Sequence, residues 1–259
     1  PGMGKTAHTI DIVRECMNRN LSLRYYSLEM SADQLLGRLV SNLSGCRYSN
    51  LSRGIIDIKS AYNDALGDFL NSKVEIIDKG GMSWFDIESN GIASAESESV
   101  DVVIIDFLQL VKGNGKHSET ETLNEVARGC KALAKELNAV VFGLAQLNRE
   151  VEKRPNKIPQ LSDLKQSGAI EEAADKVLMY YRPKYYGLDP MQVFNTDRYD
   201  GVNEDVIIVA KNRSGATGVH NTTFEYDSMS FVDKTEQDRE YPKVENNKIN
   251  PPEMDEIPF

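Results

Sequence analysis

Short apolar runs alternate with amphipathic stretches along most of the chain. The apolar runs lie at 23–28, 74–78, 100–107 and 139–146. Continuous runs of this kind are typical of parallel strands that are buried on both faces. Helical spacing of apolar residues predicts helices at 6–19, 31–43 and 123–137, and Ser-Ala-Asp-Gln at 31–34 predicts a capping box. The polar stretch 45–72 is also expected to be helical. The alternation indicates an α/β fold with a mostly parallel central sheet flanked by helices.

The last third of the chain has a different pattern. Strands are expected at 176–181 and 205–210, followed by two strands around 225–231 that form a β-hairpin edge. From 233 onward the chain is polar, carries four prolines and has eight acidic against four basic residues. We therefore predict a folded domain at 1–232 and a disordered acidic tail at 233–259.

Composition narrows the class of protein. No apolar run approaches the roughly 20 residues that span a bilayer, so we expect a cytoplasmic protein without a membrane partner. The three cysteines and three histidines are scattered and show no metal-ligand spacing. The net charge of −10 argues against a uniformly basic nucleic-acid surface. A local basic path remains open, because residues 149–184 hold eight basic against six acidic side chains.

The chain begins with the last six positions of the phosphate-loop motif G-x-x-x-x-G-K-[ST]. Gly2, Met3 and Gly4 form a loop in which the glycines permit close approach to phosphate. Lys5 supplies a cation for the terminal phosphates, and Thr6 supplies a hydroxyl for Mg²⁺. A glycine-rich turn before a helix is the alternative, and a second motif disfavours it.

That second motif lies at the ends of the predicted strands. Asp106 ends an apolar strand, as a metal-holding Walker B carboxylate does. Glu29 and Gln146 end two other strands, and ligands collect at the carboxyl ends of parallel strands. Glu29 is placed to polarise an attacking water, and Gln146 to sense the terminal phosphate. The alternatives are a first-turn helix carboxylate for Glu29 and a hydrogen-bonded loop amide for Gln146.

Six stretches resemble the C-terminal, RecA-like motor domain of DnaB-type replicative helicases. They read PGMGKT, SLEMSADQLLGRL, VVIIDFLQL, KALAKELNAVVFGLAQLNREVEKRP, LSDLKQSGAIEEAAD and AKNRSGATG, and they extend from residue 1 to about 226. The resemblance implies a RecA-like P-loop NTPase that uses ATP and Mg²⁺. It also implies a homo-hexameric ring on single-stranded DNA, with a primase and a helicase loader as partners.

The resemblance also implies roles for individual residues. Glu29 becomes the catalytic base and Gln146 the phosphate sensor. Lys211 and Arg213 become cations that reach the neighbouring subunit's nucleotide, although the sequence alone also permits a solvated charge pair. The DNA-contacting positions are Lys165, Gln166 and Gly168, with Lys153, Arg154 and Lys157 as further candidates. Lys165 stands where the family commonly has Arg, so the charge is kept without a bidentate phosphate contact.

The chain departs from the family pattern at two places, and two functions other than a helicase motor remain open. The first glycine of the phosphate loop is absent, so we expect the chain as given to be impaired in nucleotide binding and ring assembly. The end Asp-Glu-Ile-Pro-Phe resembles the tip of bacterial single-stranded DNA-binding proteins, and Phe259 is expected either to dock on a reader of such tips or to stay solvated. The rival functions are a RecA-like recombinase or loader ATPase, and a non-hydrolysing DNA-binding module.

Overall fold

Two four-stranded sheets and the helices around them make up the fold. The computed structural model describes residues 2–49, 59–113, 117–194 and 204–233. The predicted tail after Asp233, including Phe259, lies outside this part of the chain. No helix within these ranges is long and apolar enough to cross a membrane.

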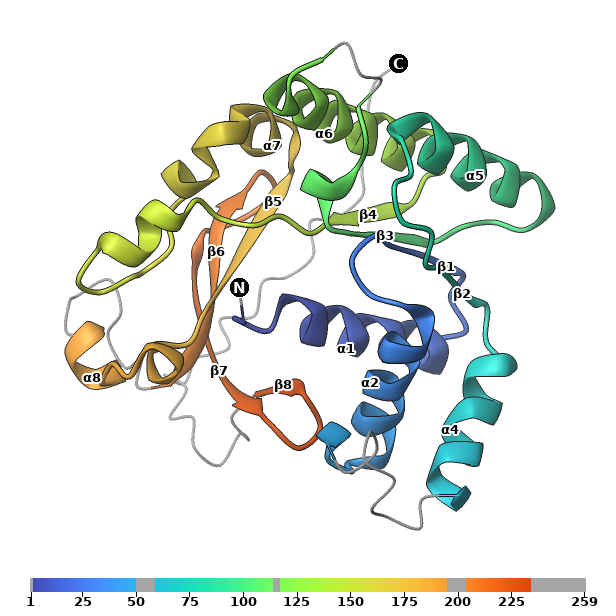
Figure 1. Ribbon diagram of the computed structural model, residues 1–259, viewed down its shortest axis with the longest axis horizontal. Coiled ribbons are helices and arrows are strands. Elements are labelled where there is room, and N and C mark those ends of the chain that lie inside the picture. The colour runs from blue at the N-terminus through green and yellow to red at the C-terminus, as the bar shows by residue number, and fades with distance from the viewer. Residues whose placement is uncertain (1, 50–58, 114–116, 195–203, 234–259) are drawn as a thin grey trace, which may run out of the picture.

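The first sheet is parallel and has the order β2-β1-β3-β4 (Figure 1). Its strands are β1 (Leu23–Ser27), β2 (Val74–Ile77), β3 (Val102–Asp106) and β4 (Val140–Gly143). All residues of β1 and β3 are buried, as their continuous apolar runs predict. The register pairs Ser27 with Asp106, so β1 and β3 end side by side.

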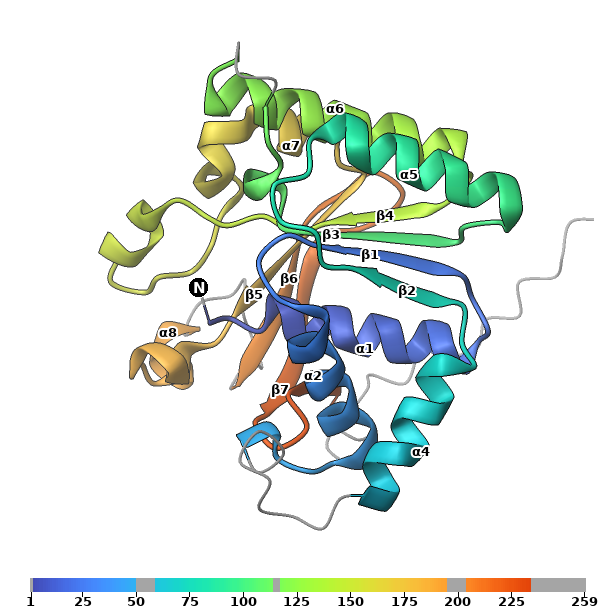
Figure 2. The same ribbon diagram turned by 45° about the vertical axis from the view of Figure 1, so that its right-hand side comes forward.

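Helices cover both faces of the parallel sheet (Figure 2). They are α1 (Lys5–Asn18), α2 (Ala32–Ser44), α4 (Lys59–Leu70), α5 (Trp84–Ser97) and α6 (Glu119–Glu136). Tyr25 and Ile104 face α1 and α2, whereas Tyr26 and Ile105 face α5 and α6. This alternation follows from the two-residue period of side chains along a strand.

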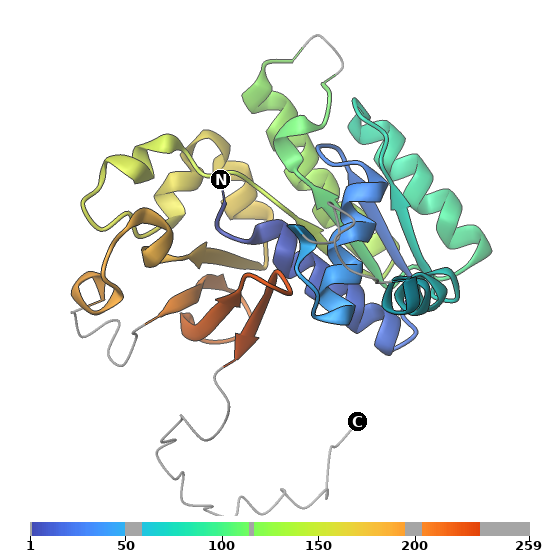
Figure 3. The ribbon, with the colours of Figure 1, turned by 60° about the horizontal axis from the view of Figure 1, so that its bottom comes forward.

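The second sheet is antiparallel and has the order β5-β6-β7-β8. Its strands are β5 (Lys176–Tyr181), β6 (Asp205–Asn212), β7 (Gly218–Glu225) and β8 (Ser230–Asp233). Figure 3 shows α1 between this sheet and the helices α2 and α4. Two short helices, α7 (Gly168–Ala173) and α8 (Pro190–Val193), flank β5, and 3₁₀ segments cover Leu108–Leu110, Arg149–Lys153, Leu161–Ser167 and Pro183–Tyr186.

The sequence-based fold prediction is confirmed in its main part. The parallel sheet, its flanking helices and the capping box of Ser31 and Gln34 are present. The antiparallel part is larger than the predicted hairpin, because β5 pairs with β6 and not with β4. The helix α5 was not predicted, although Ser83 and Asp86 form a capping box at its start. Of the predicted helix at 45–72, Lys59–Leu70 is helical and 50–58 lies outside the described residues.

Candidate nucleotide-binding site

The two sequence motifs meet at the ends of α1 and β3. The Thr6 hydroxyl donates a hydrogen bond to Asp106 Oδ2 across 3.2 Å. Thr6 lies in the first turn of α1, and Asp106 is the last residue of β3. Residues that are one hundred positions apart in sequence therefore share a hydrogen bond, which brings the predicted phosphate loop and the predicted Walker B carboxylate together.

Asp106 is a buried carboxylate with several partners. The residue is only 3% exposed, and the Tyr25 hydroxyl donates to Oδ2 at 3.0 Å. The Tyr25 oxygen also lies 2.9 Å from the Thr9 hydroxyl. Burial raises the pKa of Asp106 above its usual range, while the bonds from Tyr25 and Thr6 and the charges of Lys5 and Arg38 lower it. The carboxylate is desolvated but surrounded by groups that favour its charged form.

Lys5 lies at the same edge of the sheet. Its ammonium donates to the carbonyl of Ala145 at 2.7 Å, two residues beyond the end of β4. Burial lowers the pKa of Lys5, and the carboxylates of Asp106 and Glu29 oppose that shift. The ammonium is thus bound by a backbone carbonyl, and two nearby carboxylates favour its charged form.

The glycines give the loop before α1 its shape. Gly2 and Gly4, on either side of Met3, have φ of 75° and 90°, which is the left-handed region. A Cβ on Gly2 would lie 2.4 Å from the Tyr185 hydroxyl, and one on Gly4 would lie 2.7 Å from the Phe231 ring. Gly4 is the N-cap residue of α1 and offers no side-chain acceptor to the first amides of the helix, and a helix N-terminus of this kind favours an anion.

The other predicted strand-end residues follow neighbouring strands. Glu29 is exposed two residues after β1, and Gln146 follows β4 by three residues. Gln109 holds the backbone of Gln146: its Nε2 donates to the Gln146 carbonyl at 3.1 Å, and its Oε1 accepts from the Gln146 amide at 3.3 Å. Glu29, Asp106 and Gln146 therefore lie along one edge, as predicted, while their chemical roles stay predictions.

The Thr6–Asp106 pair has the donor atoms that Mg²⁺ prefers. A hydroxyl and a carboxylate are hard oxygen ligands. The described residues contain no group of three or more His, Cys, Asp or Glu side chains that could hold a metal ion by themselves. In nucleotide sites Mg²⁺ is commonly held by one or two protein groups together with substrate phosphates, and the pair is sufficient for that arrangement.

Lys211 and Arg213 contact a different part of the fold. Lys211 donates to the backbone carbonyl of Glu171, and Arg213 Nη2 donates to that of Glu172 at 2.6 Å. Arg213 also lies 3.4 Å from Asp175. Both cations thus cap the carboxyl end of α7, where a positive charge is favourable. These contacts tie them to α7 and not to the Thr6–Asp106 pair of the same chain.

The predicted DNA-contacting residues lie just before that helix. Lys165 and Gln166 belong to the 3₁₀ segment Leu161–Ser167, and Gly168 begins α7. Buried Asp163 anchors the segment by accepting from the Gln160 amide at 2.7 Å.

The three further basic residues that were predicted as DNA contacts have different surroundings. Arg154 forms an ion pair with Asp163, so this side chain also supports the 3₁₀ segment. Lys153 lies 2.6 Å from Glu150, and Lys157 lies over the Tyr186 ring at 5.8 Å.

Three site residues were not predicted from the sequence. Tyr25 and Gln109 support Asp106 and Gln146, as described above. Arg182 donates to the Gly2 carbonyl at 3.2 Å, and its guanidinium lies 3.8 Å from the centre of the Phe224 ring. These three side chains reach the site through the register of β1 and β3 and the packing of the second sheet. Neither the register nor the packing can be predicted from residue spacing.

Comparison with known proteins agrees with this geometry. The family model of the DnaB-like helicase C-terminal domain matches residues 1–233. The replicative DNA helicase DnaB of Geobacillus stearothermophilus is 32% identical over 237 residues, which cover 90% of this chain and 50% of that protein. The DnaB of Rickettsia conorii is 36% identical over 253 residues, with 88% and 50% covered.

Solved structures show the same relationship. One of them, an isolated ATPase domain, has a TM-score of 0.80 and 29% identity, and the match covers 90% of this chain and 82% of that one. A DnaB-like replicative helicase, described with its interactions with primase, has a TM-score of 0.79 and 29% identity, with 90% and 55% covered. The chain spans about half the length of the curated relatives. The chain belongs to the DnaB-like helicase C-terminal domain family.

Proposed function

We propose that the chain is the ATP-hydrolysing motor of a replicative DNA helicase, which acts as a homo-hexameric ring, translocates on single-stranded DNA and unwinds duplex. The observation that carries the proposal is the hydrogen bond between Thr6 and the buried Asp106, beside Lys5. Membership of the helicase family supports it. Primase is the proposed partner, since a related helicase was described with its interactions with primase, and a helicase loader is proposed by analogy.

Each residue has a role in the proposed reaction. Lys5 and the first amides of α1 hold the β- and γ-phosphates of ATP. Thr6 and Asp106 would hold Mg²⁺, which would offset the charge of the phosphates. Glu29 accepts a proton from water as the water oxygen bonds to the γ-phosphorus. The bond from that phosphorus to the β-phosphate oxygen then breaks, and ADP leaves with the electron pair.

Glu29→Gln tests the base in a protein that carries the complete phosphate-loop motif. ATP hydrolysis stimulated by single-stranded DNA should fall by about 10²–10⁴-fold, because general-base assistance is of that size. ATP binding should be nearly unchanged, since Lys5 and Thr6 remain. The control is Asp33→Asn, which removes a carboxylate from the first turn of α2. If both variants lost the same share of ATP hydrolysis, Glu29 would act as a charge at a helix end and not as the base.

Asp106→Asn should change stability and binding in opposite directions. Burial raises the pKa of Asp106 in the folded chain above its ordinary value of 3.8. The protonated carboxyl therefore favours the folded state at low pH, and this contribution to folding stability is lost as the pH rises through the folded-state pKa. The nucleotide-free variant should therefore have a higher urea midpoint than the unsubstituted chain at pH 7–8, with a smaller difference near pH 4. Mg²⁺-dependent ATP binding should be lost.

Tyr25→Phe is the companion variant for urea unfolding. It removes a hydrogen bond to a buried charge, which should lower the free energy of unfolding by about 1.5–3 kcal/mol.

An Asp106→Asn chain that is less stable than the original at pH 8 would contradict the upward shift assigned to the pKa of Asp106.

Subunit mixing tests whether Lys211 and Arg213 act on a neighbour. Arg213→Ala subunits keep their own phosphate loop, and Lys5→Ala subunits keep their own Arg213. In mixed rings with the complete motif, hydrolysis should persist only where an intact loop meets an intact Arg213 of the next subunit. The measurement is ATPase rate against mixing ratio. Because no chain in the mixture has both residues intact, an absence of hydrolysis at every mixing ratio would exclude action in trans.

Lys165→Ala tests the proposed DNA contact. Each phosphate contact on single-stranded DNA adds about 0.7 to the slope of log affinity against log salt. The variant should lose about that amount of slope, and DNA should no longer stimulate hydrolysis. Lys135→Ala is the matched control, because this exposed lysine lies in the last turn of α6 and is not among the predicted DNA contacts. Unchanged affinity and slope in assembled Lys165→Ala rings would remove this residue from the DNA site.

A further inference from the structure

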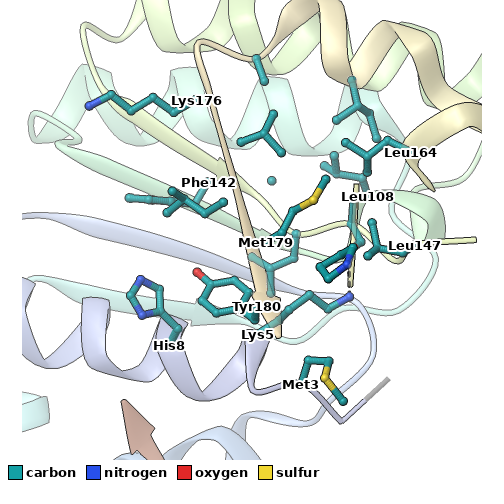
Figure 4. Close-up of a pocket in the computed structure, with 18 of the residues that line it drawn as sticks. Met3, Lys5, His8, Leu108, Phe142, Leu147, Leu164, Lys176, Met179 and Tyr180 are labelled. Carbon is teal, nitrogen blue, oxygen red and sulfur yellow. Dashed lines mark hydrogen bonds between the residues drawn. The ribbon is translucent and has the colours of Figure 1, made fainter. Parts of the chain in front are cut away.

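Asp175 lies at the end of β5 that is remote from the predicted phosphate loop. Figure 4 shows Lys176, the first residue of β5, and Lys5 of the loop at opposite ends of this strand. An apolar cleft of about 750 Å³, bordered by β4 and β5, runs between them. Asp175 directly precedes Lys176, so it lies apart from the nucleotide site of its own chain.

The carboxylate of Asp175 is shared by two cations. Lys131 of α6 donates to Oδ2, and Arg213 Nη1 donates to Oδ1 at 3.4 Å. The side chain of Lys131 is 33% exposed, and those of Asp175 and Arg213 are each 49% exposed. The hydrogen bond from Lys131 lowers the pKa of Asp175, burial opposes this shift, and the charge of Arg213 adds to the lowering. Asp175 is therefore a charged group with two cationic partners, all within reach of water.

The backbone of Arg213 is fixed independently of this ion pair. Its amide donates to the carbonyl of Asp175 at 2.9 Å, and the preceding residue, Asn212, pairs with Lys176 in the sheet. The guanidinium is bound separately, by the carboxylate of Asp175 and by the carbonyl of Glu172 at 2.6 Å. Loss of these two acceptors would therefore free a side chain and leave the strand in place.

A structural role alone does not explain the position of Asp175. It follows Ala173, the last residue of α7, by two residues, and a negative charge is unfavourable at the carboxyl end of a helix. Lys211 and Arg213 already donate to the carbonyl groups of that end. A carboxylate there opposes the helix dipole, but it gives the Arg213 guanidinium a charged acceptor within its own subunit.

We propose that Asp175 is a positioning residue: it holds the Arg213 side chain within its own subunit until a nucleotide phosphate of the neighbouring subunit takes it over, and Lys131 eases this transfer. The inference rests on the proposed function, in which Arg213 acts on the next subunit. Phosphate is a strong bidentate acceptor for arginine, whereas an exposed ion pair contributes little. When Arg213 leaves, Lys131 still pairs with Asp175, so no carboxylate is left without a cation.

The two groups that contact each other beside Arg213 should have opposite effects on ATP hydrolysis. In Asp175→Asn, the Arg213 guanidinium loses a charged acceptor and is released more easily. In Lys131→Met, the carboxylate of Asp175 keeps only Arg213 as a partner and holds it more firmly. Because exposed ion pairs are weak, we expect each change in rate to be about twofold to fivefold.

Mixed rings with the complete phosphate-loop motif test this role. Arg213→Ala subunits supply the intact loop, and Lys5→Ala subunits supply Arg213. Asp175→Asn in the Lys5→Ala subunits should raise kcat and leave KM for ATP nearly unchanged, because the other subunit's loop binds ATP. Lys131→Met in the same subunits should lower kcat, and the double substitution should behave like Asp175→Asn. Either substitution placed in the Arg213→Ala subunits should have no such effect, whereas a structural defect would act from both kinds of subunit.

The controls and a second measurement separate this role from the proposed function. Lys135→Met and Glu136→Gln, at exposed positions of α6, should leave kcat unchanged. In the nucleotide-free chain, Asp175→Asn and Lys131→Met should each shift the NMR signal of the Arg213 Nε–H group. An unshifted signal in Asp175→Asn, or equal effects on kcat from both kinds of subunit, would overturn the proposal.

The mixed rings also show which of the two proposals fails. If rings of Arg213→Ala and Lys5→Ala subunits hydrolyse no ATP, action in trans is wrong and the role of Asp175 falls with it. If these rings hydrolyse ATP at a rate that Asp175→Asn does not change, only the role of Asp175 is overturned.

Discussion

The buried carboxylate of Asp106 is the constraint on which the rest of the site depends. A charge on a residue that is 3% exposed is stable only if hydrogen bonds and cations compensate for lost water. Tyr25, Thr6 and Lys5 supply that compensation from β1 and α1. The requirement ties the start of α1 to the end of β3, and so fixes the position of the predicted phosphate loop relative to the parallel sheet.

The contacts of Lys211 and Arg213 link the end of β6 to the end of α7. In one subunit both cations bind the carbonyls at the end of α7, directly after the segment with the predicted DNA contacts. In the proposed ring, a phosphate bound by a neighbouring subunit would compete with these carbonyls for the same donors, because a charged acceptor forms the stronger hydrogen bond. Exchange of partners would then free the carboxyl end of α7.

Much of the fold was predictable because apolar periodicity reports burial. The buried runs at β1 and β3 and the capping box at Ser31 were recognised for this reason. The helix α5 was missed, although its capping box at Ser83 and Asp86 was a usable signal. The separate antiparallel sheet was not predicted, because spacing along β5 does not say which strand is its neighbour.

The sequence by itself determined the local chemistry of this protein: the glycines, Lys5 and Thr6 of the loop, and acidic or amide residues at the strand ends. Such motifs depend on residues that are close in the chain, so spacing reveals them. Only the tertiary structure decided that Tyr25 supports Asp106, that Arg182 holds Gly2, and that β4 and β5 border an apolar cleft. These depend on strand register and on the packing of two sheets, which arise from contacts between residues far apart in sequence.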